Sequence, residues 1–108
     1  MSLTIDNYVI DTLMRDLTEH ERSPSAFLVY LYLWRMTLGG QQRRVSLSYQ
    51  QLSEATGLSK SAVQNAVKLL TRRALLKSRT ESKTATPSYR VERPWNRRKA
   101  AQQKQMLP

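Results

Sequence analysis

Two short helices separated by a glycine form the feature that most restricts how this chain can fold. Ser48 and Ser59 each precede a run of helix-forming residues. A serine in that position caps a helix by accepting a hydrogen bond from the helix backbone. Gly57 lies between the two runs and admits the left-handed backbone that a sharp turn requires. The pattern predicts helices over residues 49–56 and 59–73 that cross steeply after this glycine.

Apolar residues supply the contact at which these helices would cross. Leu52 and Ala55 form the expected inward side of the first helix. The second helix has an apolar stripe at helical spacing: Val63, Ala66, Val67 and Leu70. A pair of this kind is a helix-turn-helix, whose second helix enters the major groove of DNA.

The segment before this pair predicts two more helices. Ser23 and Pro24 open a helix that is apolar on almost every side as far as Leu38, and Gly39-Gly40 ends it. Such a helix is covered on more than one side, so it is either the central helix of the domain or also meets another subunit. Upstream, Ile5–Leu17 predicts an amphipathic helix, or a shorter one after an extended start, followed by a polar break over 18–22.

Short alternating segments predict the β structure. Val45–Ser48 alternates apolar and polar residues, as a short strand does. Leu75–Thr80 and Ser88–Glu92 predict a hairpin whose exposed loop is Glu81–Pro87. The expected fold is mainly α with a small β-hairpin: a three-helix core, a hairpin wing over 75–92 and an extra N-terminal helix. The expected domains are 1–22 (N-terminal helix and connection), 23–95 (the DNA-binding domain) and 96–108 (a basic, flexible tail).

Tyr49–Leu76, with its turn pattern from Leu52 to Val63, resembles the winged helix-turn-helix family. The stretch is most similar to N-terminal domains of phage and plasmid replication-initiation proteins and to small bacterial transcriptional regulators. The resemblance extends from Ser23 to Val91. It implies a DNA-binding domain whose recognition helix is 59–73 and whose wing reaches a minor groove or the phosphate backbone.

The charge is divided unevenly along the chain. The whole sequence has a formal net charge of +10, yet residues 1–42 carry −2. Residues 43–108 hold fifteen Lys and Arg against three Glu, a net charge of +12. An excess of this size attracts polyanions, nucleic acid foremost. Double-stranded DNA is therefore the expected partner.

The helical spacing also selects the residues expected to touch DNA. With the apolar stripe inward, the outward face of the recognition helix comprises Lys60, Ser61, Gln64, Asn65 and Lys68. Amides can make paired hydrogen bonds to adenine, and lysine can reach guanine or phosphate. Tyr49 and Ser59 stand at helix starts, which favour phosphate. The remaining candidates are cations: Arg79, Lys83 and Arg90 on the wing, and Arg72 at the helix end, where it contacts DNA or only stabilises the negative end of the helix.

Three functions are compatible with these residues. The first is a sequence-specific transcriptional regulator that acts by occupying its site, which a stand-alone product of this length favours. The second is the DNA-binding module of a plasmid or phage replication initiator, which a truncated chain would favour. The third is a winged-helix module that docks onto an acidic protein.

Enzymatic and membrane functions are not expected. The chain has no cysteine and one histidine, His20, so thiol chemistry is excluded and neither a metal site nor a catalytic triad is expected. The longest apolar run, Ala26–Trp34, has nine residues, well short of the roughly 20 that cross a bilayer. We expect no cofactor, no small-molecule ligand and a cytoplasmic, nucleoid-associated protein.

Surplus apolar surface predicts a homodimer through residues 5–38. The Ile5–Leu17 stripe and the apolar helix after Ser23 exceed what one three-helix domain readily covers. The competing interpretation is that the N-terminal helix folds over the central helix within one chain. A two-fold dimer would set two recognition helices at a spacing of whole DNA turns.

Overall fold

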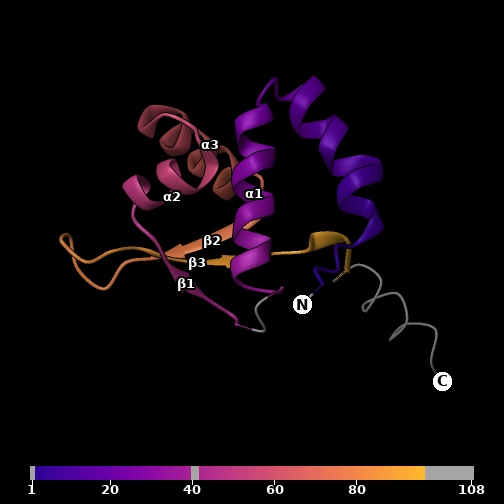
Figure 1. The fold of residues 1–108 in the computed structure, drawn as a ribbon. Helices are drawn as coiled ribbons and strands as arrows, with labels where there is room; N and C mark the ends of the chain where they lie inside the picture. Colours follow the sequence, from indigo (N-terminus) through magenta and orange to yellow (C-terminus); the bar gives the residue numbers. More distant parts are fainter. Residues whose placement is uncertain (1, 40–41, 97–108) are drawn as a thin grey trace.

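A computed structural model describes residues 2–39 and 42–96 of this 108-residue chain. Along the chain the elements are η1 (Val9–Leu13), η2 (Asp16–His20), α1 (Pro24–Met36), β1 (Val45–Ser46), α2 (Tyr49–Thr56), α3 (Lys60–Arg72), β2 (Leu76–Arg79) and β3 (Ser88–Val91). Figure 1 shows α1 between the N-terminal helix on one side and α2 and α3 on the other, with the strands below. This mostly helical fold with a small antiparallel sheet is the winged helix-turn-helix architecture that the sequence predicts.

Helix α1 is the centre of the molecule. Ser23 begins it as predicted, because its hydroxyl accepts a hydrogen bond from the backbone N–H of Ala26 at 3.2 Å. The helix packs against α2, α3, β3 and the N-terminal helix, and six of its thirteen residues are buried. Its last residue is Met36, three before Gly39; Gly40 lies outside the described residues. Within 2–39 and 42–96, no helix is long and apolar enough to cross a membrane.

The two predicted helices around Gly57 form with the expected caps. Ser48 makes a full capping box with Gln51, with hydrogen bonds of 3.0 and 2.9 Å. Gly57 adopts the left-handed conformation with φ of 77°. The prediction for Ala55 was wrong, since its side chain is exposed and Leu52 is the buried residue of α2. The next inward position is Thr56, one full turn after Leu52.

The strands form one antiparallel sheet in the order β1-β3-β2. The hairpin pairs Leu76 with Val91 and Lys77 with Arg90, and β1 adds Val45 beside Tyr89. All three strands are shorter than predicted. Tyr89 and Val91 are buried against the helices, so the residues that alternate with them lie on the opposite face of the sheet.

The N-terminal helix differs from its prediction. After an extended start it runs without interruption over residues 7–20, so the predicted polar break at 18–20 was wrong. Much of it has i→i+5 hydrogen bonding, as in the 3.1 Å bond from the Glu21 N–H to the Asp16 carbonyl. Thr18 also donates its hydroxyl proton to the Met14 carbonyl at 2.8 Å, so a polar residue satisfies its hydroxyl inside the helix.

This helix covers the outer side of α1. Val9, Leu13 and Leu17 are at most 2% exposed. The chain entering the helix is also fastened to the residues that follow β3: the Asp6 carboxylate accepts hydrogen bonds from Arg93 at 3.3 Å and from the Trp95 indole at 3.0 Å. Much of the surplus apolar surface that suggested a dimer is therefore covered within one chain.

Candidate nucleic-acid interface

The outward side of α3 is a continuous polar surface. Val63, Ala66, Val67 and Leu70 are buried as predicted, and this fixes the rotation of the helix about its axis. The five residues predicted on the other side are all exposed. We call this set the α3 face: Lys60, Ser61, Gln64, Asn65 and Lys68. It presents two amides, a hydroxyl and two ammonium groups and no carboxylate.

The residues at the starts of α2 and α3, Tyr49 and Ser59, differ in how accessible their side chains are. Ser59 is exposed, and its hydroxyl caps α3 by accepting from the Ala62 N–H at 3.1 Å while lying 3.3 Å from the Ser61 hydroxyl. Tyr49 is partly buried against the core, and its phenol lies close enough to Tyr89 to influence the pKa of that phenol. Burial and, to a lesser extent, Tyr49 raise the pKa of Tyr89 to about 12. Tyr49 therefore lies beside the sheet, whereas Ser59 lies beside the α3 face.

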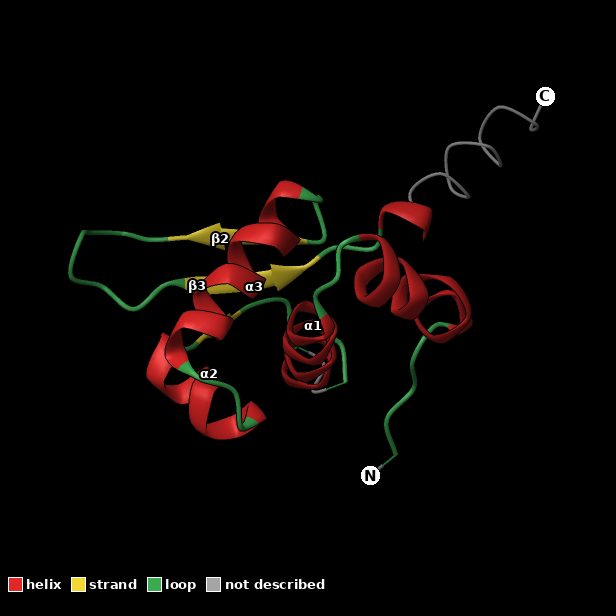
Figure 2. Cartoon of the chain, turned by 90° about the horizontal axis from the view of Figure 1, so that it is seen from above, coloured by secondary structure: helices red, strands yellow, loops and turns green. Residues whose placement is uncertain are grey.

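The wing loop carries Lys83 away from the body of the protein. Residues 80–87 join β2 to β3, and Figure 2 shows this loop extending beyond the helices. A turn stabilises its end, because the Ala85 N–H donates to both the carbonyl and the hydroxyl of Ser82 at 3.2 Å. Lys83 lies inside that turn and is exposed.

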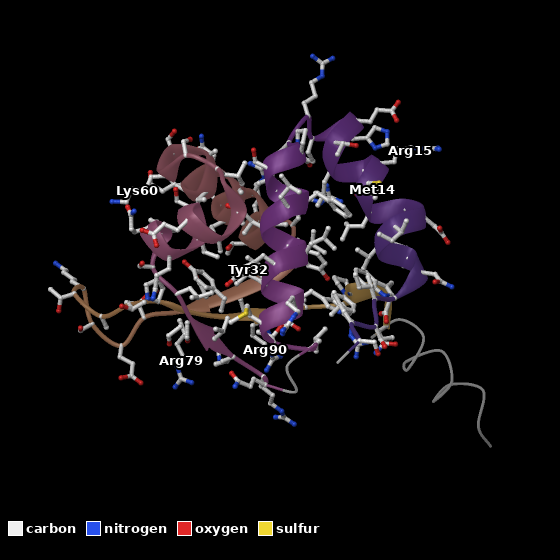
Figure 3. The ribbon with its side chains drawn as sticks, in the orientation of Figure 1. Met14, Arg15, Tyr32, Lys60, Arg79 and Arg90 are labelled. Carbon is white, nitrogen blue, oxygen red and sulfur yellow. The ribbon has the colours of Figure 1, made fainter. Side chains whose placement is uncertain are left out.

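Arg79 and Arg90 occupy the wing strands but face away from α3. Each alternates with a residue that points toward the helices, and Arg79 pairs with Ser88 across the hairpin. Figure 3 shows both arginines on the lower side of the sheet, whereas Lys60 lies above it. The structure thus separates these two predicted residues from the α3 face.

Arg72 lies at the far end of α3 and contacts the N-terminal helix region. Its guanidinium is 3.3 Å from the Glu21 carboxylate. Arg73 beside it pairs with Glu21 at 3.0 Å and with Asp16. The hydrogen bond from Arg73 lowers the pKa of Asp16, with a smaller contribution from His20. These ion pairs tie the end of α3 to the N-terminal helix region, a role for Arg72 that the sequence did not predict.

The structure therefore gathers part of the predicted site. Ser59 and the α3 face form one surface, Lys83 stands on the adjoining wing loop, and the other four residues lie elsewhere: Tyr49, Arg72, Arg79 and Arg90. Two cations absent from the prediction, Arg43 and Arg44, precede β1, and Arg44 donates to the Ser88 hydroxyl at 3.2 Å. Their position in the basic half was the only signal in the sequence for this contact, because the β1–β3 pairing joins residues more than 40 apart in sequence.

Comparison with family models matches residues 23–76, half of the chain, to a helix-turn-helix domain. The match begins at the cap of α1 and ends at the first residue of β2, so it covers α1, α2 and α3. Comparisons with curated proteins and with solved structures give no significant match.

Proposed function

Because this chain belongs to the helix-turn-helix domain family, we propose that it recognises a specific sequence in double-stranded DNA and regulates transcription in a bacterial cell by occupying that site. DNA binding follows from the family, and the regulatory role is our inference. One observation carries the specificity: Gln64 and Asn65 are neighbouring exposed amides on α3, with a lysine before and after them.

The α3 face has the chemistry of a base-reading surface. An amide side chain can accept and donate at one adenine edge, and a serine hydroxyl can contact several bases. Lys60 and Lys68, at the two ends of the face, would contact phosphates and fix the register of the helix in the major groove. The Ser59 cap places the N-terminal end of α3 where its positive dipole favours a further phosphate. No carboxylate on this face opposes the duplex.

The wing would supply a second contact to the same duplex. Lys83 stands on a loop that extends past the helices, so it can reach a minor groove or the backbone beside the groove that α3 occupies. Tyr49, Arg72, Arg79 and Arg90 stay predictions as DNA contacts. Of these, Arg72 is also held by Glu21, and the Tyr49 phenol lies close to Tyr89.

We further propose that the protein works as a homodimer through residues 5–38, without catalysis, in the cytoplasm at the nucleoid. Several large apolar side chains of this segment remain exposed, among them Ile10 at 47%, Met14 at 37% and Leu28 at 46%. Ile10 and Met14 are four residues apart on one helix and so share a side of it. A two-fold pair joined there would present two α3 faces to one duplex.

Selection of binding sites from a random duplex library tests the proposal. We expect an enriched motif, and we expect it to be palindromic if two copies bind together. Duplex binding without any enriched motif would contradict sequence-specific recognition. Absence of duplex binding in moderate salt would favour the protein-docking function instead. A motif that maps to a replication origin rather than to promoters would favour a replication initiator.

A further inference from the structure

The face of the sheet turned away from the helices carries its own set of cations. Arg44, which precedes β1, donates to Ser88 on β3, and the remaining outward residues follow from the strand register. We call this surface the outer sheet face: Arg44, Ser46, Lys77, Arg79, Ser88 and Arg90. Its side chains are four cations and two hydroxyls.

Two hollows in and beside this face are lined by arginines. One, of about 390 Å³, is bordered by Arg43, Arg90 and Arg93. The other, of about 250 Å³, is bordered by Arg44 and Arg79 together with serine and threonine hydroxyls. Each hollow is bordered by a single carboxylate, Glu92 in the first and Glu81 in the second. Planar guanidinium groups around a polar hollow suit the oxygens of a phosphate.

The buried carboxylate in this region holds cations in place. The Glu92 side chain is 8% exposed and lies 3.0 Å from Arg90 and 3.5 Å from Lys77. It therefore orients two neighbouring cations. Arg44 instead donates to the Ser88 hydroxyl, and among the described residues neither Arg44 nor Arg79 forms an ion pair, although Glu81 borders the same hollow. The outer sheet face keeps a net positive charge.

Geometry separates this surface from the proposed recognition site. Helices α1 and α3 pack on the inner face of the sheet, so the α3 face and the outer sheet face lie on different sides of the molecule. One straight duplex lying along α3 cannot also cover the outer sheet face.

We propose that the outer sheet face binds the phosphate backbone of a second duplex segment, so that one molecule holds two segments together. The proposal rests on the proposed duplex binding by α3 and adds a partner for the opposite side. A membrane suits this face less well, because interfacial binding needs several apolar anchors. Of the exposed large apolar side chains in the described ranges, none belongs to a strand and one, Leu38, borders a hollow of this surface.

A bridging assay tests this inference. One duplex is immobilised, the protein is added at low salt, and capture of a second, fluorescent duplex is measured alongside binding to a single duplex. The double variant Arg43→Gln/Arg44→Gln removes one cation of the outer sheet face, Arg44, and one that borders the hollow beside it, Arg43. The proposed α3 and wing-loop contacts use neither of these arginines. We expect near wild-type binding of a single duplex and about tenfold weaker capture of the second, because each lost phosphate contact weakens binding.

The matched control is Arg15→Gln/Arg35→Gln, which removes the same charge from exposed positions in the N-terminal half. It should capture the second duplex as the wild type does. Wild-type protein that binds one duplex but captures no second would overturn the inference while leaving the proposed function intact. Equal capture by the two double variants would also overturn it, since bridging would then come from two α3 faces of a dimer. Wild-type protein that binds no duplex at all would overturn the proposed function itself.

Loss of binding to anionic phospholipid vesicles in Arg43→Gln/Arg44→Gln, with no second duplex captured by the wild type, would assign the face to a membrane and reject the inference.

Discussion

Among individual residues, Gln64 and Asn65 are the pair on which sequence recognition depends. Replacing either by alanine should cost about 1–3 kcal/mol on the selected site, because a paired hydrogen bond to a base is lost. Binding to a scrambled duplex should hardly change. Fluorescence anisotropy with both duplexes measures the difference, and Asn7→Ala, an exposed amide on the N-terminal helix, is the control. If both α3 variants still select the wild-type motif from a library, another surface reads the bases.

The ion pair of Asp16 and Arg73 gives a pH-dependent prediction. The Arg73 guanidinium holds the pKa of Asp16 below its usual value of 3.8. The stabilisation is therefore complete above that value and is lost as the pH falls through the lower pKa of the folded state. Asp16→Asn should lower the free energy of unfolding by about 1 kcal/mol at pH 7. The difference in stability between this variant and the wild type should shrink in acid. Thermal melts across this range provide the measurement.

Asp11→Asn is the control for that series, since Asp11 is exposed on the same helix. It should melt like the wild type at every pH. A gap between Asp16→Asn and the wild type that persists below the lowered pKa of Asp16 would show that the carboxylate charge is not what stabilises this contact.

Residue types and their spacing predicted most contacts between residues that are close in sequence. The caps at Ser23, Ser48 and Ser59 could be predicted because a cap involves residues only three apart. The partners of Arg72 and Arg73 could not be, because Asp16 and Glu21 lie more than 50 residues away and meet them only through packing. Which wing cations face α3 depended on strand register, which the sequence pattern of the hairpin left open.

At the scale of helices and turns, three described residues adopt a left-handed backbone, and one of them, Arg22, precedes the cap of α1 with φ of 52°. Gly57 ends α2 with φ of 77°, and Ala74 follows α3 with φ of 59°. A methyl group at Gly57 would meet no atom within 4 Å, so Gly57→Ala costs only backbone strain, about 1 kcal/mol. Ala74→Gly should instead raise the free energy of unfolding by roughly 0.5 kcal/mol. Glycine relieves the backbone strain of the folded state, and this gain exceeds the stability lost because glycine gives the unfolded chain more entropy.

Urea denaturation of Gly57→Ala and Ala74→Gly measures these opposite changes in the free energy of unfolding. Gly57→Asn is an informative control, since asparagine tolerates the left-handed region and should cost less than alanine. Equal or reversed shifts for Gly57→Ala and Ala74→Gly would contradict the assignment of strain to these two positions.

The elements were predictable where periodicity is local and strong. Helices α1, α2 and α3 follow from caps and from a 3.6-residue repeat. The N-terminal helix was predicted too short because its polar residues Thr18–His20 suggested a break, whereas i→i+5 hydrogen bonds carry the helix through them. Such bonding leaves no signature in the sequence pattern.

For the whole molecule, the proposed dimer is tested by its mass. Light scattering at micromolar protein should give twice the 12.5 kDa of one chain. Ile10→Lys/Met14→Lys should give a single chain that remains folded, because both side chains are exposed within one copy. The double variant Arg15→Gln/Arg35→Gln, with one change on the N-terminal helix and one on α1, controls for altered surface charge in this half of the chain. A wild-type mass near one chain that does not rise with concentration would rule out the dimer.

The polyanion partner could be predicted from charge alone, but its placement could not. The +12 of residues 43–108 pointed to nucleic acid, yet only the fold divides the cations of the described residues among surfaces such as α3, the wing loop and the outer sheet face. Apolar surplus likewise suggested a dimer before the structure showed the N-terminal helix covering α1 with Val9, Leu13 and Leu17.

The salt dependence of duplex binding tests the central claim, that the α3 face lies on DNA, most directly. Affinity for one duplex is measured against salt concentration for the wild type, for Lys60→Gln/Lys68→Gln and for Arg15→Gln/Arg35→Gln. Each phosphate contact contributes about 0.9 to the log–log slope, so the α3 variant should lose nearly two units of slope and bind every sequence more weakly, while the control keeps the wild-type slope. Identical slopes for the two double variants would contradict the claim.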